Sequence, residues 1–351
     1  MAVDEKKMEE FVGKVLADMG AAAIAPLNVI GDQLGLYKAI AKSGGLTSEE
    51  LAKETGTFER YVREWAYAQT AAGYITYDSE TSKFSMSPEQ ALVFADENSP
   101  FYLNGGFYAI SSCHIDHHLI RDAFKSGEGV PWGSHNDCLF CGTAKFFKPG
   151  YLTNLTESWI PSLEGVEDKL KAGANVADVG CGHGLSTVIM AKEYPNSTFI
   201  GYDFHEESVE AARKEAAEAG VSNAHFEVAD AKIFPGNDYD LVACFDCLHD
   251  MGDPVGVSKH IRQSLKDDGT WMLVEPIAGD KPEDNFHLLG QMLYSFSTMV
   301  CTPASLSQEV GLGLGAQAGE ARLREVTSEG GFTRCRRTAE TATNMVLEVR
   351  P

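Results

Sequence analysis

The stretch "VADVGCGHG", residues 176–184, decides how the rest of the chain is interpreted. An apolar run leads into Asp178, and three glycines then stand at every second position, Gly180, Gly182 and Gly184. Glycines at the end of a strand permit positive φ angles and let a ligand approach backbone N–H groups closely. The stretch therefore predicts a ligand-binding loop between a buried strand and a following helix.

From about residue 170 the chain alternates between strand and helix patterns. Helices are expected at 186–193, 206–219 and 254–265, and strands at 175–179, 198–202, 225–228, 240–245 and 270–274. Such alternation predicts a parallel sheet with helices on both faces. Two last strands, 332–338 and 345–349, have no long helix between them, so we expect an antiparallel hairpin at a sheet edge.

An acidic residue ends the second and the third of these strands. Asp203 follows the glycine loop by about twenty residues, the spacing at which a carboxylate accepts hydrogen bonds from ribose hydroxyls. Up to this point the pattern fits any adenosine cofactor, NAD and S-adenosylmethionine included. Asp230 after the third strand can accept the exocyclic amine of adenine, and Phe245 in "YDLVACFDCLHDM" can stack near the ligand.

The glycine loop itself favours one of the two cofactors. It reads D-x-G-x-G-x-G and not G-x-G-x-x-G. Together with the acids at the strand ends, residues 170–351 closely resemble the class I S-adenosylmethionine-dependent methyltransferases. The resemblance implies the cofactor S-adenosyl-L-methionine and its contacts: Asp178 with the methionine amino group, the backbone of Gly180, Cys181 and Gly182 with the methionine part, Asp203 with the ribose, Phe204 with adenine, Asp230 and Ala231 with the adenine amine and ring, and Phe245 beside the ligand.

A candidate catalytic base follows the fourth strand. His249 in "LHDMGDP" stands at the sheet rim where ligands of open α/β sheets bind. The segment is similar to that of plant-type small-molecule O-methyltransferases, in which the His removes a proton and an acid at the end of the fifth strand orients it; Glu275 takes that place here. Met251 departs from the aromatic residue usual in that family. The alternative is that His249 only forms a hydrogen bond near the cofactor.

Residues 46–87 predict a winged helix-turn-helix. Thr47 and Glu50 form a capping box for a short helix that Gly56 ends, a second helix follows, and a hairpin closes the unit. The motif can bind DNA through its second helix, or it can serve as a dimerisation or lid module. The second helix carries both arginines and glutamates, which disfavours DNA binding.

The whole chain resembles a bacterial, notably mycobacterial, family that joins a winged-helix domain to this methyltransferase fold, on stretches such as "ADVGCGHGLST" and "CTPASLSQE". The resemblance implies a seven-stranded sheet and a homodimer formed through the N-terminal domain. We divide the chain into a winged-helix-like dimerisation domain (1–98), a linking helical or lid region (99–165) and a cofactor-binding domain (166–351).

Composition narrows the possible partners. The formal net charge of −22 over 351 residues removes the usual attraction to nucleic acid. The first ten residues are mostly charged and match no signal peptide, and no apolar run reaches the roughly 18 residues of a membrane helix. These observations predict a soluble, cytoplasmic protein that acts on a small molecule.

Cysteines and histidines raise the question of a metal ion. Two C-x-x-C pairs, at 138/141 and 244/247, could form a zinc site, and His114, His117 and His118 could bind a metal or line a pocket. Buried cysteine more often behaves as a small apolar residue, and Cys181 inside the cofactor loop has no room for further ligands. We therefore expect no metal ion.

Three functions remain to be compared. The sequence favours a small-molecule methyltransferase whose acceptor lies between region 99–165, a helix at 286–310 and the sheet rim, with Tyr108, His114, His118, Trp132 and Tyr294 as candidate lining residues. The alternative is a transcriptional regulator that binds S-adenosylmethionine as a signal and DNA through the winged helix. A nucleic-acid or protein methyltransferase is disfavoured by the charge and by "DCLH" where amino-methylating enzymes have an "NPPY"-type tetrad.

Overall fold

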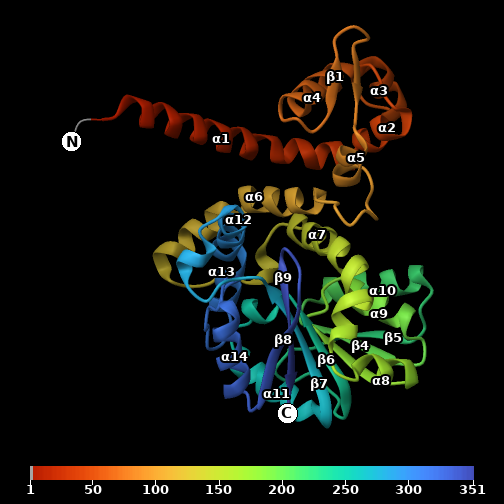
Figure 1. The fold of residues 1–351 in the computed structure, drawn as a ribbon, viewed down its shortest axis with the longest axis vertical. Helices are drawn as coiled ribbons and strands as arrows, with labels where there is room; N and C mark the ends of the chain where they lie inside the picture. The colour runs from red at the N-terminus through yellow and green to blue at the C-terminus, as the bar shows by residue number, and fades with distance from the viewer. Residues whose placement is uncertain (1–2) are drawn as a thin grey trace. The chain divides into compact units, whose positions relative to one another are not determined.

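The computed structural model of the protein describes residues 3–351 and divides into two compact units (Figure 1). Unit 1 comprises Met1–His114 and Asp137–Pro149, and unit 2 comprises Ile115–Asn136 and Gly150–Pro351. Two helices, α6 (Asn104–Ser126) and α7 (Cys138–Asn154), run from one unit into the other. The division of the chain into domains 1–98, 99–165 and 166–351 stays a prediction.

Unit 1 contains the winged helix-turn-helix. Besides its parts of α6 and α7, this unit contains α1 (Glu5–Gln33), α2 (Leu36–Ser43), α3 (Ser48–Thr55), α4 (Glu59–Ala71), β1 (Thr76–Asp78), β2 (Lys83–Ser85) and α5 (Pro88–Phe94). The capping box is present: the hydroxyl of Thr47 accepts the N–H of Glu50, whose carboxylate accepts the N–H of Thr47. Gly56 ends α3 at a φ of 66°, a conformation that glycine adopts without strain.

A buried carboxylate holds unit 1 together. Asp32 in α1 accepts hydrogen bonds from the hydroxyls of Tyr102 (2.8 Å) and Tyr108 (2.7 Å) and from Nζ of Lys145 (2.7 Å). These donors come from segments 70 or more residues away in the chain. Burial alone would raise the pKa of Asp32, but the three donors outweigh it and hold this pKa below its ordinary value.

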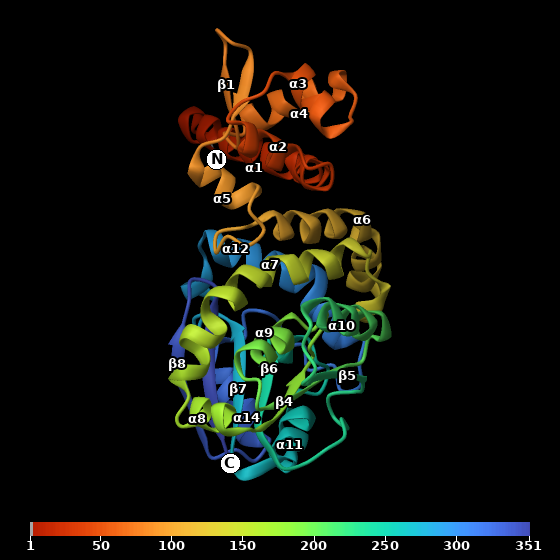
Figure 2. The ribbon, with the colours of Figure 1, turned by 90° about the vertical axis from the view of Figure 1, so that its right-hand side faces the viewer.

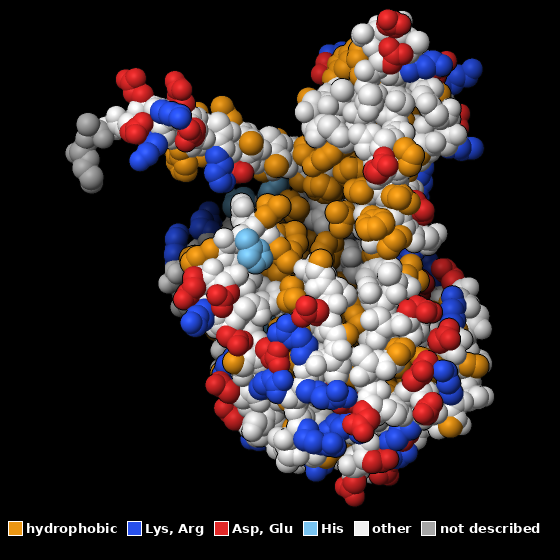
Figure 3. All heavy atoms as spheres, in the orientation of Figure 1, with side chains coloured by type: hydrophobic (Ala, Val, Ile, Leu, Met, Phe, Trp, Pro, Cys, Tyr) orange, Lys and Arg blue, Asp and Glu red, His pale blue; other side chains and the backbone are white. Residues whose placement is uncertain are grey.

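The first half of α1 leaves its apolar side chains exposed. Phe11 and Leu16 are 64% and 62% exposed, and other apolar residues of this half are exposed as well, namely Met8, Val12, Val15 and Met19. Hydrophobic side chains are visible along α1 in Figure 3. Among the described residues α1 is also the one helix that could cross a membrane by length and composition, a test that core helices of soluble proteins pass too.

Unit 2 is built on a seven-stranded sheet of order β5-β4-β3-β6-β7-β9-β8. The strands are β3 (Asn175–Val179), β4 (Thr198–Asp203), β5 (Ala224–Val228), β6 (Tyr239–Phe245), β7 (Leu265–Pro276), β8 (Arg334–Glu340) and β9 (Asn344–Arg350). The first five pair in parallel, and β9 pairs antiparallel with both β7 and β8. The predicted parallel sheet with a terminal antiparallel hairpin at its edge is thus confirmed.

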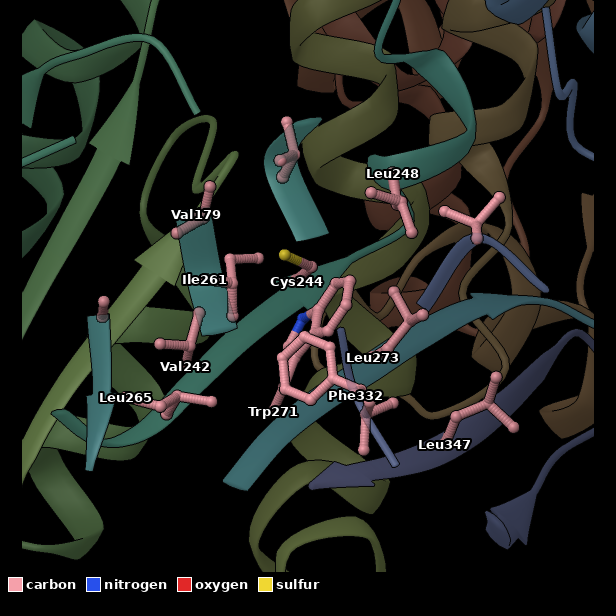
Figure 4. Close-up of a cluster of buried hydrophobic side chains, with 14 of the residues drawn as sticks. Val179, Val242, Cys244, Leu248, Ile261, Leu265, Trp271, Leu273, Phe332 and Leu347 are labelled. Carbon is pink, nitrogen blue, oxygen red and sulfur yellow. The ribbon is translucent and has the colours of Figure 1, made fainter. Parts of the chain in front are cut away.

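Helices cover both faces of this sheet, as Figure 2 shows. On one face lie α8 (Val166–Ala172), α9 (Leu185–Glu193) and α10 (Glu206–Ala219), and on the other α11 (Pro254–Ser264) and α14 (Gly319–Glu329). Inward side chains of α11 and α14, such as Ile261, pack against the sheet in the cluster drawn in Figure 4. The same cluster includes Trp271 of β7 and Phe332. This packing fixes the strand ends from which the site is built.

The helix expected at 286–310 is present from 288 to 306, with a π-helical turn inside it. Its consecutive parts are α12 (Leu288–Phe296), the π-helical turn η6 (Ser297–Cys301) and α13 (Thr302–Leu306). The short helical turns η1 (Trp132–Ser134), η2 (Leu155–Trp159), η3 (Ile160–Ser162), η4 (Leu248–Asp250) and η5 (Pro282–Asn285) were not expected.

Candidate functional site

The carboxyl ends of the parallel strands carry the candidate site. The strand order reverses between β3 and β6, so the loops after these two strands leave the sheet in opposite directions. Ligands of open α/β sheets bind in the crevice that such a reversal creates. The predicted cofactor residues and the predicted base all lie at or just after the carboxyl ends of β3, β4, β5 and β6 on this edge.

The glycine loop after β3 has the backbone expected of it. Gly180, Gly182 and Gly184 have φ angles of 75°, 52° and 75°. A side chain at Gly180 would meet Sγ of Cys247 at 2.7 Å, whereas nothing lies within 4 Å of the corresponding position at Gly182. The loop is thus closed on its inner side at Gly180 and open at Gly182.

Asp178 is fully buried at the start of this loop. Its Oδ2 accepts hydrogen bonds from the hydroxyls of Ser186 (2.7 Å) and Thr187 (2.6 Å). Its Oδ1 is buried and accepts no hydrogen bond from any residue that the structure describes. Burial raises the pKa of this carboxyl to about 6, despite the two hydroxyls. A buried oxygen without a partner is costly, and a cationic ligand group would relieve that cost.

Asp203 joins the end of β4 to the glycine loop. Its Oδ2 accepts the N–H of Gly182 at 2.9 Å, and its Oδ1 accepts the N–H of His205 at 2.9 Å. Burial raises the pKa of Asp203 although both backbone bonds lower it. The carboxylate is thereby fixed in orientation, with lone pairs to spare for a vicinal diol.

The residues predicted to contact adenine lie in the open part of the rim. Phe204 is 57% exposed, Asp230 is exposed and Ala231 is half-buried. Ile233, which the sequence did not single out, is 75% exposed, and its N–H donates to the carbonyl of Asp230. Two exposed apolar side chains therefore follow neighbouring strands beside Asp230.

Cys181 and Phe245 point into the protein. Cys181 is buried, packs with the cluster that includes Phe226, and has its thiol pKa raised by that burial. Phe245 is buried against Tyr151 and Trp159, with ring centroids 5.4 and 6.5 Å away. The backbone contact of Cys181 and the ligand contact of Phe245 stay predictions.

His249 and Glu275 meet as the sequence predicted. Nδ1 of His249 lies 2.5 Å from Oε2 of Glu275, and the other carboxylate oxygen accepts the N–H of Leu248 at 2.9 Å. Both side chains are buried. Because a carboxylate accepts from Nδ1, the imidazole presents its Nε2 as the available nitrogen.

Two further groups face this nitrogen, and the sequence did not identify either. Oδ1 of Asp250 lies 3.2 Å from Nε2 of His249, and Sγ of Cys301 belongs to the same cluster, in which the nearest ligand atoms all lie within 4.8 Å. Cys301 is 52 residues from His249, so no local pattern could join them. The candidate acceptor residues Tyr108, His114, His118, Trp132 and Tyr294 stay predictions.

The donor set fits S-adenosylmethionine. The unpartnered buried Oδ1 of Asp178 suits an ammonium group, the open face at Gly182 admits a ligand beside backbone N–H groups, and Asp203 is oriented for a ribose. An exposed Phe204 offers a ring for adenine.

Comparisons with known proteins agree with this geometry. A family model described as "Methyltransferase domain" matches residues 170–312, and one described as "Rv2258c-like winged HTH domain" matches residues 22–95. A methyltransferase of Bacillus subtilis named YcgJ and described as uncharacterized is 32% identical over 114 residues, or 32% of this chain and 44% of the relative. The chain spans about half the length of the curated relatives it matches.

Solved structures share the fold over nearly the whole chain. The mitomycin 7-O-methyltransferase MmcR has a TM-score of 0.67 at 17% identity, covering 99% of both chains. Human N-acetylserotonin methyltransferase, solved with S-adenosylmethionine, has a TM-score of 0.69 at 16% identity, covering 97% of both chains.

These findings define a class I, S-adenosylmethionine-dependent methyltransferase fold with an N-terminal winged helix. More specifically, residues 170–312 are similar to a methyltransferase domain and residues 22–95 to a winged helix-turn-helix of the Rv2258c-like type.

Proposed function

We propose that the protein transfers the methyl group of S-adenosylmethionine to an oxygen of a small molecule, with His249 as general base. The observation that carries the proposal is the buried contact between His249 and Glu275 at the rim that also carries the cofactor residues. The named structures support it, because one of them is a mitomycin 7-O-methyltransferase and another an N-acetylserotonin methyltransferase. The acidic chain supports it as well, since a net charge of −22 disfavours nucleic acid as acceptor.

The cofactor supplies an activated methyl group on a sulfonium. Asp178, the glycine loop and Asp203 would hold it, and the protein then has to align an acceptor oxygen with the methyl carbon at roughly 3–3.5 Å. The bound cofactor would supply the methyl group, with an O–CH₃ bond replacing the S–CH₃ bond, and Nε2 of His249 would take the acceptor proton. Glu275 keeps Nδ1 protonated and so keeps Nε2 directed to the acceptor.

The charge state of His249 links its role as a general base to the binding of the cofactor. Burial lowers the pKa of His249, but the carboxylates of Asp250 and Glu275 outweigh it and hold this pKa well above the ordinary value. An imidazolium cannot accept a proton. We expect the positive charge of the bound cofactor to favour neutral His249, so the base becomes competent when the methyl donor is in place.

Methyl transfer to a panel of phenols and enols, followed with a labelled methyl group, tests the base. We expect His249→Ala to reduce turnover by roughly 10²–10⁴-fold, the contribution typical of a general base, with unchanged cofactor affinity. His225→Ala is the matched control, because His225 is an exposed histidine on β5 of the same unit. Unaltered turnover in His249→Ala would leave His249 with a hydrogen-bonding role only.

We further propose that α1 forms a homodimer with α1 of a second copy. Its exposed apolar half adjoins a groove of about 530 Å³ between α1 and α4 that is lined largely by small residues, among them Ala17, Gly20, Ala21, Ala68 and Ala71. Large side chains and a small-residue groove on one helix suit an isologous pairing, in which each copy fills the groove of the other.

A sedimentation measurement tests this pairing. Phe11→Glu combined with Leu16→Glu places two charges in the apolar half of α1, so we expect the dimer to dissociate, with the dimer dissociation constant rising at least tenfold. Leu92→Glu in α5 is the control, because it adds a charge at another partly exposed apolar position of unit 1. A wild-type protein that sediments as a monomer would exclude the dimer.

DNA binding by the winged helix has less support. The arginines of α4 are paired with glutamates one turn away, Arg60 with Glu64 and Arg63 with Glu59. A recognition helix needs unpaired basic groups for phosphates. A gel-shift experiment at low salt that retards random duplex DNA would restore the regulator as an alternative.

The cytoplasm is the proposed location. The buried cysteines Cys181, Cys244 and Cys301 form no disulfide in the structure, which suits a reducing compartment.

A further inference from the structure

We propose that His249, Asp250 and Cys301 form a binding site for a divalent transition metal of the zinc type. The three side chains offer an imidazole nitrogen, a carboxylate oxygen and a sulfur whose mutual separations are all within 4.8 Å. His249 and Cys301 are buried, and the side chain of Asp250 is 21% exposed. The sequence predicted no metal ion, and no local pattern joins Cys301 to the other two residues.

The pair His249 and Asp250 has a separation that suits two ligands of one cation. Nε2 of His249 and Oδ1 of Asp250 are 3.2 Å apart, a distance that also fits an ion pair when the imidazole is protonated. Tetrahedral zinc with bonds of about 2.0–2.2 Å to nitrogen and oxygen holds such atoms roughly 3.3 Å apart. Both lone pairs can therefore converge on one cation with little movement.

Glu275 supplies the outer support that metal-binding histidines usually have. Its Oε2 lies 2.5 Å from Nδ1 of His249, which fixes the ring and leaves Nε2 with the lone pair. A carboxylate on the far nitrogen also makes the imidazole a better ligand. Glu275 is itself held by the N–H of Leu248, so the orientation does not depend on solvent.

Cys301 is brought to this place by an irregular helix. It ends the π-helical turn η6, and π-helical turns occur frequently at functional sites. The hydroxyl of Ser305 donates to the carbonyl of Met251, and the amide of Gln308 donates to the carbonyl of Asp250. These bonds tie the segment after Cys301 to the turn that carries His249 and Asp250.

The chemistry of the three donors selects the metal. A thiolate and an imidazole favour Zn²⁺ or Co²⁺ over Mg²⁺ and Ca²⁺, which prefer oxygen ligands. Ionised Asp250 and Cys301 would balance the charge of a divalent ion, and coordination deprotonates a thiol outright. Three protein ligands leave one position open, the arrangement of zinc sites that accept water or a substrate oxygen.

Metal binding and base catalysis use the same lone pair of His249. A bound metal would therefore remove the proton acceptor and inhibit methyl transfer. This consequence rests on the proposed function, whereas binding of the metal does not.

Titration of the reduced full-length protein with Co²⁺, followed by absorption, tests the site without any acceptor. The protein should carry Cys138→Ser and Cys141→Ser, which remove the C-x-x-C pair of α7 as an alternative source of thiolate ligands. We expect one Co²⁺ per chain with a thiolate-to-cobalt charge-transfer absorption. Cys301→Ser should lose this absorption, and Cys335→Ser, at a half-buried cysteine on β8, should keep it.

Glu275→Gln gives a graded response. We expect it to retain the absorption but to weaken Co²⁺ binding by roughly 10–100-fold, as loss of an outer carboxylate does. Far-ultraviolet circular dichroism shows that each variant is folded. Protein with only Cys138→Ser and Cys141→Ser that lacks the absorption at stoichiometric Co²⁺, or folded protein with Cys301→Ser added that keeps it, would overturn the proposal.

Discussion

Each unit of the protein buries an aspartate, and the two are surrounded differently. Asp32 in unit 1 accepts from two tyrosine hydroxyls and one ammonium group, and these donors hold its pKa below the ordinary value against the effect of burial. Asp178 in unit 2 has two hydroxyls on one oxygen and, among residues 3–351, no hydrogen-bond partner on the other, and burial raises its pKa to about 6.

The difference in hydrogen-bond donors distinguishes a carboxylate with a structural role from one that is suited to bind a ligand. A carboxylate whose donors come from the protein itself stabilises the fold in the absence of ligand. A buried carboxylate with one oxygen left over destabilises the unliganded protein, and that cost can be recovered when a cation binds. On this comparison Asp32 belongs to the architecture of unit 1, and we propose that Asp178 belongs to the cofactor site.

Removing the structural carboxylate should have the larger effect. We expect Asp32→Ala to destabilise unit 1 by about 3 kcal/mol, because two tyrosine hydroxyls lose their acceptor and Lys145 loses its partner. Hydrogen exchange resolved along the chain measures this, with faster exchange in α1–α5 than in the strands of unit 2. Asp18→Ala, which breaks an exposed pair with Lys14, is the control and should change little. Equal protection in Asp32→Ala and wild type would contradict the structural role.

A smaller effect should appear in the pH dependence of the cofactor site. The pKa of Asp178 is raised from 3.8 to about 6, so its neutral form is favoured by folding. Its contribution to stability is present at low pH and is lost as the pH rises through about 6. Cofactor binding needs the charged form, so the affinity for S-adenosylhomocysteine should fall by up to tenfold per pH unit below about 6.

Asp178→Asn isolates this dependence. It should bind S-adenosylhomocysteine more weakly at neutral pH and should lose the decline below pH 6, as calorimetry at several pH values can measure. A decline of the same size in wild type and Asp178→Asn would assign it to another group.

Much of unit 2 could be predicted from the sequence because its patterns are local. The glycines of 180–184 and the acids at the strand ends mark where each strand stops, and strand ends of a parallel sheet meet at one edge. The contact between His249 and Glu275 followed from the same rule, although 26 residues separate them. The periodicity of the sequence was therefore enough to predict contacts between residues that are brought together by the strand directions alone.

The rest depended on contacts that no spacing encodes. Asp32 meets Lys145 across 113 residues, and Cys301 reaches His249 through a π-helical turn in a segment predicted as one regular helix. In α4 the buried face is Val62, Trp65, Ala66 and Gln69, and Tyr61, which directly precedes Val62, is 80% exposed. Apolar spacing shows that a helix forms, but its orientation is set by whatever packs against it.

The most direct test of the account is a calorimetric titration with S-adenosylmethionine, S-adenosylhomocysteine and NAD, using wild-type protein and Asp203→Ala. We expect wild type to bind the first two and not NAD. Asp203→Ala should weaken both by roughly a hundredfold, because the ribose loses its acceptor and the loop loses the bond at Gly182. Binding of NAD alone, or unchanged S-adenosylmethionine affinity in Asp203→Ala, would contradict the assignment of this rim as the cofactor site.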